Sequence, residues 1–106
     1  MMITSIPNDK TRRVLALPKD FSGYTVDSFR TEFEQLAVCE QDFIVLDFSE
    51  TEFIDSSGIG AMVFLYKRIE QKGQQLALLK VNGQPHKLMN LLRVDKTIPF
   101  IDKLDA

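Results

Sequence analysis

Cysteine and histidine each occur only once in this chain of 106 residues, and their scarcity excludes whole classes of function. A single cysteine, Cys39, rules out an internal disulfide and a zinc site built from several cysteines. Cys39 follows an apolar stretch, so we interpret it as a buried thiol that packs as a small hydrophobic residue. A single histidine, His86, lies at an expected exposed helix start, which leaves the serines without a general base. Hydrolysis by a serine nucleophile is therefore not expected.

Clustered positive charge and long apolar runs are also missing. The 13 lysines and arginines are scattered and the formal net charge is −2, so we expect no nucleic-acid partner, because phosphate binding needs clustered cations. The longest helical apolar run, residues 59–66, is far shorter than the roughly 20 residues that span a membrane. No signal peptide is visible at the N-terminus. These features predict a cytoplasmic protein without direct membrane insertion.

The apolar pattern predicts a single α/β domain over residues 1–106. Strands are expected at residues 2–6, 12–17, 43–48 and 75–81, with a short edge strand at 98–101. The uninterrupted apolar run at 43–48 is typical of a strand that is covered on both faces. The turn residues 7–10 predict a hairpin, which would give the sheet an antiparallel N-terminal edge.

Three helices are expected between these strands. The first begins at Thr25, which we interpret as its N-cap, the second covers residues 57–72 before Gly73, and the third starts near Pro85. Strands that alternate with helices need crossover connections, which make a sheet mostly parallel. The fold class is therefore a small α/β sandwich with a mixed, mostly parallel sheet of about four or five strands.

The stretch "FIDSSGIGAM", residues 53–62, carries the most unusual group of residues. It follows a strand, and α/β sheets usually bind ligands in the loops after the carboxyl ends of their strands. Its serines lack the Gly-x-Ser-x-Gly frame of a hydrolase, and its glycines lack the Lys-Ser/Thr pair of a phosphate-binding loop. Asp47 and Asp55 could share a magnesium ion, although no third ligand is evident. The alternative for Asp47 is a carboxylate that binds loop amides.

Two interpretations of Ser56 and Ser57 remain open from the residues alone. In the first, Asp55 or Ser56 caps the following helix and the two glycines allow close packing. In the second, a serine at the exposed helix start is phosphorylated, because orphan N–H groups and the positive helix end tolerate a phosphate there. The phosphate would add about −1.5 to −2 charges beside Asp55, a change large enough for a switch.

The segment "IVLDFSETEFIDSSGIGAMVFLYKRIEQKGQQLALLKVN" resembles the signature region of STAS domains, specifically of bacterial anti-sigma factor antagonists. In that family a strand ending in aspartate leads to Asp-Ser-Ser-Gly-Leu-Gly at the start of a helix. The matching residues are Asp47, Asp55, Ser56, Ser57, Gly58, Ile59 and Gly60. The resemblance covers about residues 43–81 and implies a STAS-type fold.

The resemblance implies a regulator that exchanges partners, not an enzyme, with no cofactor of its own. The unphosphorylated form would bind a serine kinase that is also an anti-sigma factor, or a related regulator. Phosphorylation of the serine after the motif aspartate, Ser56, would end that binding, with Ser57 as the second candidate. A PP2C-type serine phosphatase would then restore the active form. The partner would contact the motif residues Asp55, Ser57, Gly58, Ile59 and Gly60.

Ser22 and Phe64 complete the expected partner surface. Phe21 and Ser22 lie where the family often has Leu-Asp in a turn near the phosphorylation site. Phe64 is expected on the helix face opposite the apolar residues Ile59, Met62, Leu65, Tyr66 and Ile69. The chain also departs from the family in "LLRVDKTIPF", which lacks the usual glycine after the third helix. The alternative function is an accessory STAS subunit of a membrane lipid or anion transporter, which needs no phosphoacceptor.

Overall fold

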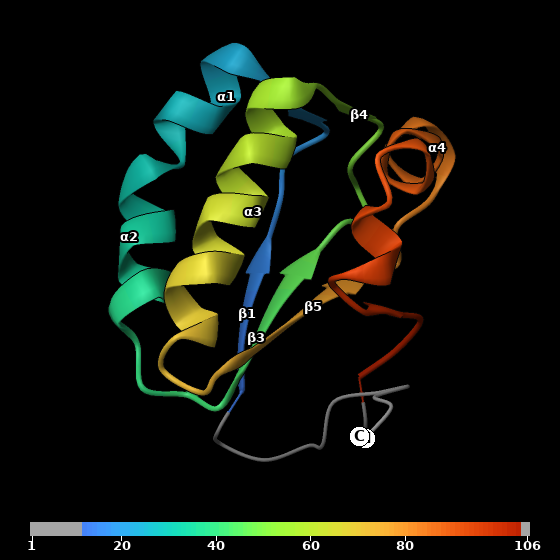
Figure 1. Ribbon diagram of the computed structural model, residues 1–106. Helices are drawn as coiled ribbons and strands as arrows, with labels where there is room; N and C mark the ends of the chain where they lie inside the picture. The colour runs from blue at the N-terminus through green and yellow to red at the C-terminus, as the bar shows by residue number, and fades with distance from the viewer. Residues whose placement is uncertain (1–11, 105–106) are drawn as a thin grey trace.

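A four-stranded sheet forms the centre of the molecule in the computed structural model, which describes residues 12–104 (Figure 1). Its strands are β1 (Arg12–Ala16), β3 (Phe43–Asp47), β5 (Gln75–Leu79) and β6 (Phe100–Ile101). They lie in the order β1-β3-β5-β6, and all neighbouring strands run parallel. A second, two-stranded parallel sheet pairs β2 (Asp20–Phe21) with β4 (Phe53–Ile54). These strands confirm the predicted α/β fold with a mostly parallel sheet.

The helices are distributed unequally around the sheet. They are α1 (Gly23–Ser28), α2 (Arg30–Val38), α3 (Ser56–Glu70) and α4 (Gly83–Leu91), followed by the short 3-10 helix η1 (Val94–Lys96). Figure 1 shows α1, α2 and α3 together over one face of the four-stranded sheet, whereas α4 and η1 lie beyond β5. Because α4 also packs against β4, it reaches the chain segment that leads into α3.

The central strand β3 is buried on both faces, as its apolar run predicts. Ile44 and Leu46 contribute to the main core beneath the helices, whereas Val45 belongs to a smaller apolar cluster on the opposite face. All three side chains are fully buried. Alternate residues of a strand point to opposite faces, so an uninterrupted apolar sequence is required here.

The inner face of α3 also follows the predicted helical phase. Ile59, Met62, Leu65 and Ile69 are buried against the sheet. These positions recur every three or four residues, which places them along one side of an α-helix. The helix is followed by Gly73 with a φ of +82°, a left-handed conformation that glycine adopts without a steric penalty.

The N-terminal predictions need two corrections. The N-cap of the first helix is Ser22 rather than Thr25, because Thr25 lies inside the first turn and its Oγ1 accepts a hydrogen bond from the Ser22 N–H. The predicted single helix is also divided at Phe29, which ends α1 and precedes α2 with a φ of −96° and a ψ of 7°. The predicted strand at residues 2–6 and its hairpin lie outside the described residues, and β1 itself pairs in parallel with β3.

Three further apolar side chains, those of Cys39, Leu91 and Leu92, are not fully buried. Cys39 is a free thiol but is only partly buried, since it lies at the end of α2. In α4 the buried residues are Pro85 and Met89, while Leu91 at its end and Leu92 just after it remain 78% and 51% exposed. The helix ends at Leu91, so these two leucines extend past the part of α4 that covers the core.

Candidate functional site

The predicted motif lies where two parallel strand ends meet. β2 and β4 pair in parallel, so the loop that follows β2 and the loop that follows β4 leave the same edge of the small sheet. Ser22 connects β2 to the start of α1 at Gly23, and Asp55 connects β4 to the start of α3 at Ser56. Two segments more than thirty residues apart in sequence therefore form one surface, at the starts of α1 and α3 (Figure 1).

Asp55 is the residue that caps α3. Its Oδ1 accepts a hydrogen bond from the Gly58 N–H at 3.1 Å, and its Oδ2 accepts one from the Gly23 N–H at 3.3 Å. A single carboxylate thus connects the N-termini of two helices, where a negative charge is favourable. Of the two capping residues that the sequence left open, the structure selects Asp55.

Ser56 and Ser57 are therefore not needed as caps. They occupy the first two positions of α3 and both side chains are exposed. Ser57 also lines a cleft of about 390 Å³ between α3 and the α1–α2 segment. Its other lining residues are Gly23, Val26, Asp27, Arg30, Phe33, Glu34, Ala61 and Phe64. Both hydroxyls are therefore on the surface, and that of Ser57 belongs to a residue that lines the cleft.

Ser22 lies at the same surface, next to an acidic residue. It is the N-cap of α1, and its Oγ donates a hydrogen bond of 2.6 Å to Asp20 Oδ1. The carboxylates of Asp20 and Asp55 thus lie on either side of the Ser22–Gly23 turn, each held by a hydrogen bond from it. Any further negative charge at this point would meet two existing ones.

Phe64 is exposed on the outer side of α3, as the helical phase predicts. The residue is 64% exposed, and the guanidinium carbon of Arg68 lies 5.6 Å from the centroid of its ring. Arg68 also forms an ion pair of 2.9 Å with Glu34 of α2. The hydrogen bond and charge of Arg68 lower the pKa of Glu34. Phe64 is therefore an apolar ring held beside an ion pair on the wall of the cleft.

Two more aromatic side chains are exposed near the same strand and helix ends. Tyr24 in the first turn of α1 is 95% exposed, and Phe53 in β4 is 45% exposed. Sequence analysis did not select either residue, because a single exposed aromatic carries no signal until the fold places it beside others. With Phe64, two turns further along α3, the structure has three exposed aromatic side chains on the elements around the motif.

The glycines and the isoleucine of the motif have different surroundings. Gly58 is buried, and a Cβ atom there would lie 2.5 Å from the Phe21 carbonyl oxygen. Ile59 is also buried, with only 8% of its surface exposed. Gly60 is exposed, and a Cβ atom would meet nothing within 4 Å. Gly58 and Ile59 therefore pack in the core beneath the motif, whereas Gly60 lies on the surface.

Gln84 of α4 supports the strand that leads into the motif, and sequence analysis missed it. The Ile54 N–H donates to Gln84 Oε1, and Gln84 Nε2 donates to the Ile54 carbonyl oxygen, both at 2.9 Å. One side-chain amide therefore satisfies both backbone groups of the residue just before Asp55. A glutamine next to Pro85 gives no sequence signal for this contact.

Asp47 and His86 have structural partners of their own. The Asp47 carboxylate accepts a hydrogen bond from the Ser49 N–H at 2.9 Å, which confirms the loop-amide alternative. His86 Nδ1 lies 3.1 Å from the side-chain nitrogen of Asn90, and its ring packs edge-on against Phe100. Between residues 12 and 104, no three histidine, cysteine, aspartate or glutamate side chains are placed to hold a metal ion. The geometry therefore gives the magnesium alternative no support.

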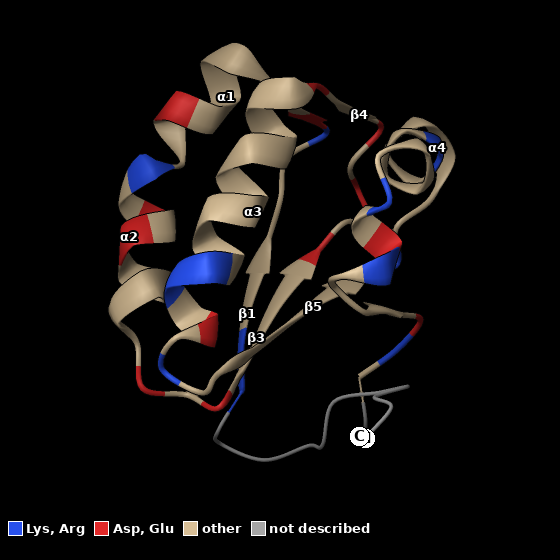
Figure 2. Cartoon of the chain, viewed as in Figure 1, with Lys and Arg blue, Asp and Glu red and all other residues tan. Residues whose placement is uncertain are grey.

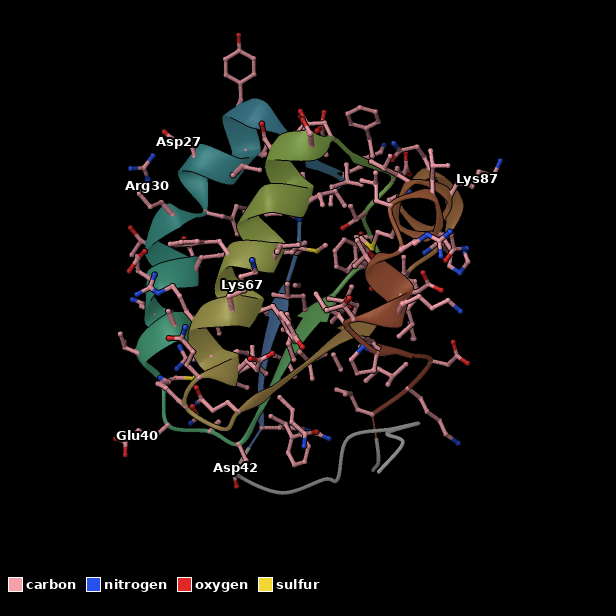
Figure 3. The ribbon with its side chains drawn as sticks, viewed as in Figure 1. Asp27, Arg30, Glu40, Asp42, Lys67 and Lys87 are labelled. Carbon is pink, nitrogen blue, oxygen red and sulfur yellow. The ribbon has the colours of Figure 1, made fainter. Side chains whose placement is uncertain are left out.

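Charge is unevenly distributed along α3. The helix has no charged residue from Ser56 to Tyr66 and two basic residues, Lys67 and Arg68, in its last turns (Figure 2). On the opposite wall of the cleft, Asp27 and Arg30 form a close ion pair along the outer edge of α1 and α2 (Figure 3).

None of the helices in the described part of the chain is long and apolar enough to cross a membrane.

Comparison with known proteins finds a family with the same motif and fold. The STAS domain family model matches residues 2–106. An anti-sigma F factor antagonist of Paenibacillus polymyxa is 31% identical over 90 residues, which cover 84% of this chain and 77% of that protein.

Solved structures share the fold at lower identity. A candidate anti-sigma factor antagonist of Thermotoga maritima has a TM-score of 0.79 at 23% identity, covering 89% of this chain and 81% of its own. A sulfate transporter family protein of Wolinella succinogenes has a TM-score of 0.76 at 17% identity, with coverages of 92% and 81%. The Bacillus cell fate determinant SpoIIAA, in its phosphorylated form, has a TM-score of 0.69 at 17% identity, with coverages of 92% and 86%.

Proposed function

The chain belongs to the STAS domain family, and we propose that it acts as an anti-sigma factor antagonist that is switched by phosphorylation of Ser56. The observation that carries this proposal is the division of tasks between adjacent residues. Asp55 caps α3 with its own carboxylate, so the hydroxyl of Ser56 is exposed and free to change without loss of the cap. The resemblance to a named antagonist at 31% identity supports the same function.

The unphosphorylated form presents the free hydroxyls of Ser56 and Ser57 beside the carboxylates of Asp55 and Asp20, with exposed apolar rings on the neighbouring elements. Aromatic side chains commonly contribute much of the binding energy of protein interfaces. Phe64, Tyr24 and Phe53 are the exposed rings, and the cleft beside Ser57 accepts a side chain of the partner. Such a surface suits a protein partner, and we propose that this partner is an anti-sigma factor with serine kinase activity.

A phosphate on Ser56 changes this surface electrostatically. It brings about −1.5 to −2 charges to a place where Asp55 and Asp20 already lie. The N–H groups at the start of α3 tolerate the phosphate, so the fold survives while the surface becomes strongly negative. The partner that docks on the unphosphorylated surface is then released. A PP2C-type phosphatase removes the phosphate and restores binding.

The chemistry in this cycle belongs to the partners. The proposed role of the chain is to be bound and modified as a cytoplasmic regulator, without catalysis, nucleic-acid binding or membrane insertion of its own. Ser57 is the second candidate for the phosphate, since it is exposed and lines the cleft.

Mass spectrometry of the protein isolated from its own cells tests the proposal. We expect one phosphate, mapped to Ser56, and no gain of mass when the purified protein is incubated with ATP and Mg²⁺ alone. Addition of the copurifying kinase should then add the phosphate to wild-type protein and to a Ser57→Ala variant, but not to Ser56→Ala. Autophosphorylation, or a stable complex with a membrane transporter and no phosphate at either serine, would reject the switch.

A further inference from the structure

Arg93 has a backbone conformation that an arginine rarely adopts. It follows the last residues of α4 with a φ of 62° and a ψ of 28°, in the left-handed region. A residue with a Cβ atom is strained there, and glycine or asparagine is the usual solution. The backbone conformation therefore does not favour an arginine here, and we looked for a role of its side chain.

The side chain of Arg93 lines a second cleft, on the other side of α3 from Phe64. This cleft has a volume of about 230 Å³ and lies between α3 and the segment from α4 to η1. Its remaining lining residues are Val63, Tyr66, Lys67, Leu92, Val94, Thr97 and Ile98. The cleft is thus apolar at its base and has two cationic side chains, Lys67 and Arg93, in its lining.

These two cations lack an acidic partner within the described part of the chain. Neither belongs to the ion pairs found between residues 12 and 104. Glu70 of α3 and Asp95 of η1, the acids closest to them in sequence, take part in none of those ion pairs either. Figure 3 shows Lys67 on the outer side of α3, directed away from the sheet. Both charges are therefore available to a carboxylate from outside.

The size of the cleft and its edges favour a protein segment as the occupant. Its volume is below the roughly 300–1,000 Å³ of typical small-molecule sites, and it holds about one large side chain. Leu92, one of its lining residues, is 51% exposed, and the preceding Leu91 is 78% exposed. Exposed leucines beside a small cleft are typical of a docking surface for another protein.

We propose that this cleft is a second docking surface, which binds an acidic and apolar segment of a partner protein. One apolar side chain of that segment enters the cleft between Val63 and Ile98, and a neighbouring carboxylate pairs with Lys67 and Arg93. The surface lies on a different side of α3 from Phe64 and does not depend on the state of Ser56. The chain can therefore contact two partners at once, or two parts of one partner.

Backbone NMR with a synthetic peptide tests this site without knowledge of the natural partner. The probe is a short peptide of alternating leucine and glutamate, and its control has lysine in place of each glutamate. We expect the acidic peptide to shift the amide signals of Val63, Lys67 and Thr97, and the basic peptide to leave them unchanged. Absence of these shifts with the acidic peptide, or equal shifts with both peptides, contradicts the proposal.

Three substitutions separate the charge of Arg93 from its backbone. Arg93→Asn and Arg93→Gly suit the left-handed conformation, so both should melt at or above the wild-type temperature while binding the acidic peptide about tenfold more weakly. Arg93→Lys retains the charge and should retain most of the binding. If Arg93→Asn binds as tightly as the wild type, the guanidinium has no role and the site is wrong. If Arg93→Gly melts at a lower temperature than the wild type, the left-handed backbone at residue 93 does not strain the arginine.

Discussion

The carboxylate of Asp55 binds the backbone N–H of Gly23, and this bond joins two helix starts that are 32 residues apart in sequence. The same side chain caps its own helix through Gly58. One residue therefore sets both the position of Ser56 and the position of the Ser22–Gly23 turn beside it.

Replacement of Asp55 by alanine removes both bonds. We expect Asp55→Ala to lower the free energy of unfolding by about 1–2 kcal/mol, as the loss of an N-cap does. Ser56→Ala should change it by less than about 0.5 kcal/mol, because an exposed side chain without a capping role contributes little. Urea denaturation of the two variants measures the difference. Equal losses in both would mean that Ser56 shares the capping task.

Alanine and aspartate at Ser56 should separate binding from stability. Ser56→Ala cannot be phosphorylated and is expected to remain bound to the kinase in the presence of ATP. Ser56→Asp adds a charge near Asp55 and Asp20 and should weaken the complex while the protein stays folded. Pull-down with the purified kinase and thermal melting provide the two measurements, with Ser57→Ala as the matched control. Equal binding by all three variants would leave the serine without a regulatory role.

Phe64 should contribute to binding but not to folding. Phe64→Ala removes an exposed ring and its contact with Arg68, which we expect to cost no more than about 1 kcal/mol of stability. The complex with the partner should weaken clearly, since an exposed aromatic is a common anchor. Met62→Ala, on the buried side of the same helix, should instead cost about 2–5 kcal/mol. Calorimetric binding and chemical denaturation test both expectations, and a loss of several kcal/mol for Phe64→Ala would contradict the first.

The two glycines of the motif should respond in opposite directions to alanine. At Gly58 the added Cβ meets the Phe21 carbonyl oxygen and the Ile54 side chain, so we expect a loss of about 1–3 kcal/mol from overpacking. At Gly60 the added Cβ meets nothing, and alanine should stabilise α3 by about 0.5–1 kcal/mol. Melting temperatures of the two variants give the comparison. A stable Gly58→Ala protein would show that β2 can move away from α3.

Gln84 should control the local stability of the strand that precedes Asp55. Gln84→Leu leaves the Ile54 N–H and carbonyl oxygen without their side-chain partner, and we expect a loss of about 1–3 kcal/mol. Hydrogen exchange at the Ile54 amide should accelerate more than exchange at the central strand β3. Gln84→Glu keeps an acceptor for the N–H but no donor for the carbonyl, so an intermediate effect is expected. Unchanged exchange at the Ile54 amide in both variants would show that the Gln84 side chain does not stabilise this strand.

Local patterns predicted those parts of the site that depend on a single element. The buried side of α3 follows from a period of 3.6 residues, so the exposed position of Phe64 could be derived from the sequence. The loop after β4 could be located because strand and helix patterns meet there. Ser56 itself was selected through the family motif, since its free hydroxyl depends on Asp55 taking the cap.

Contacts between distant segments could not be predicted in the same way. The bond from Gly23 to Asp55 depends on the parallel register of β2 against β4, which two-residue strands do not reveal. The two bonds from Gln84 to Ile54 depend on where α4 packs. The division between α1 and α2 at Phe29 was missed because the apolar spacing continues through it. Sequence analysis did not single out Arg93, because its left-handed conformation is a property of the folded backbone.

The parallel register of the sheet also determines how the chain must fold. Arg12 pairs with Phe43, and Phe43 pairs with Gln75. Each of these strand pairs therefore joins segments that are about one third of the chain apart in sequence. No hairpin between β1, β3 and β5 can form early and template the rest. Proteins dominated by such distant pairings fold more slowly than those built from local contacts. We therefore expect folding to be limited by the search of β3 for both neighbours, with α3 as the local structure that forms first.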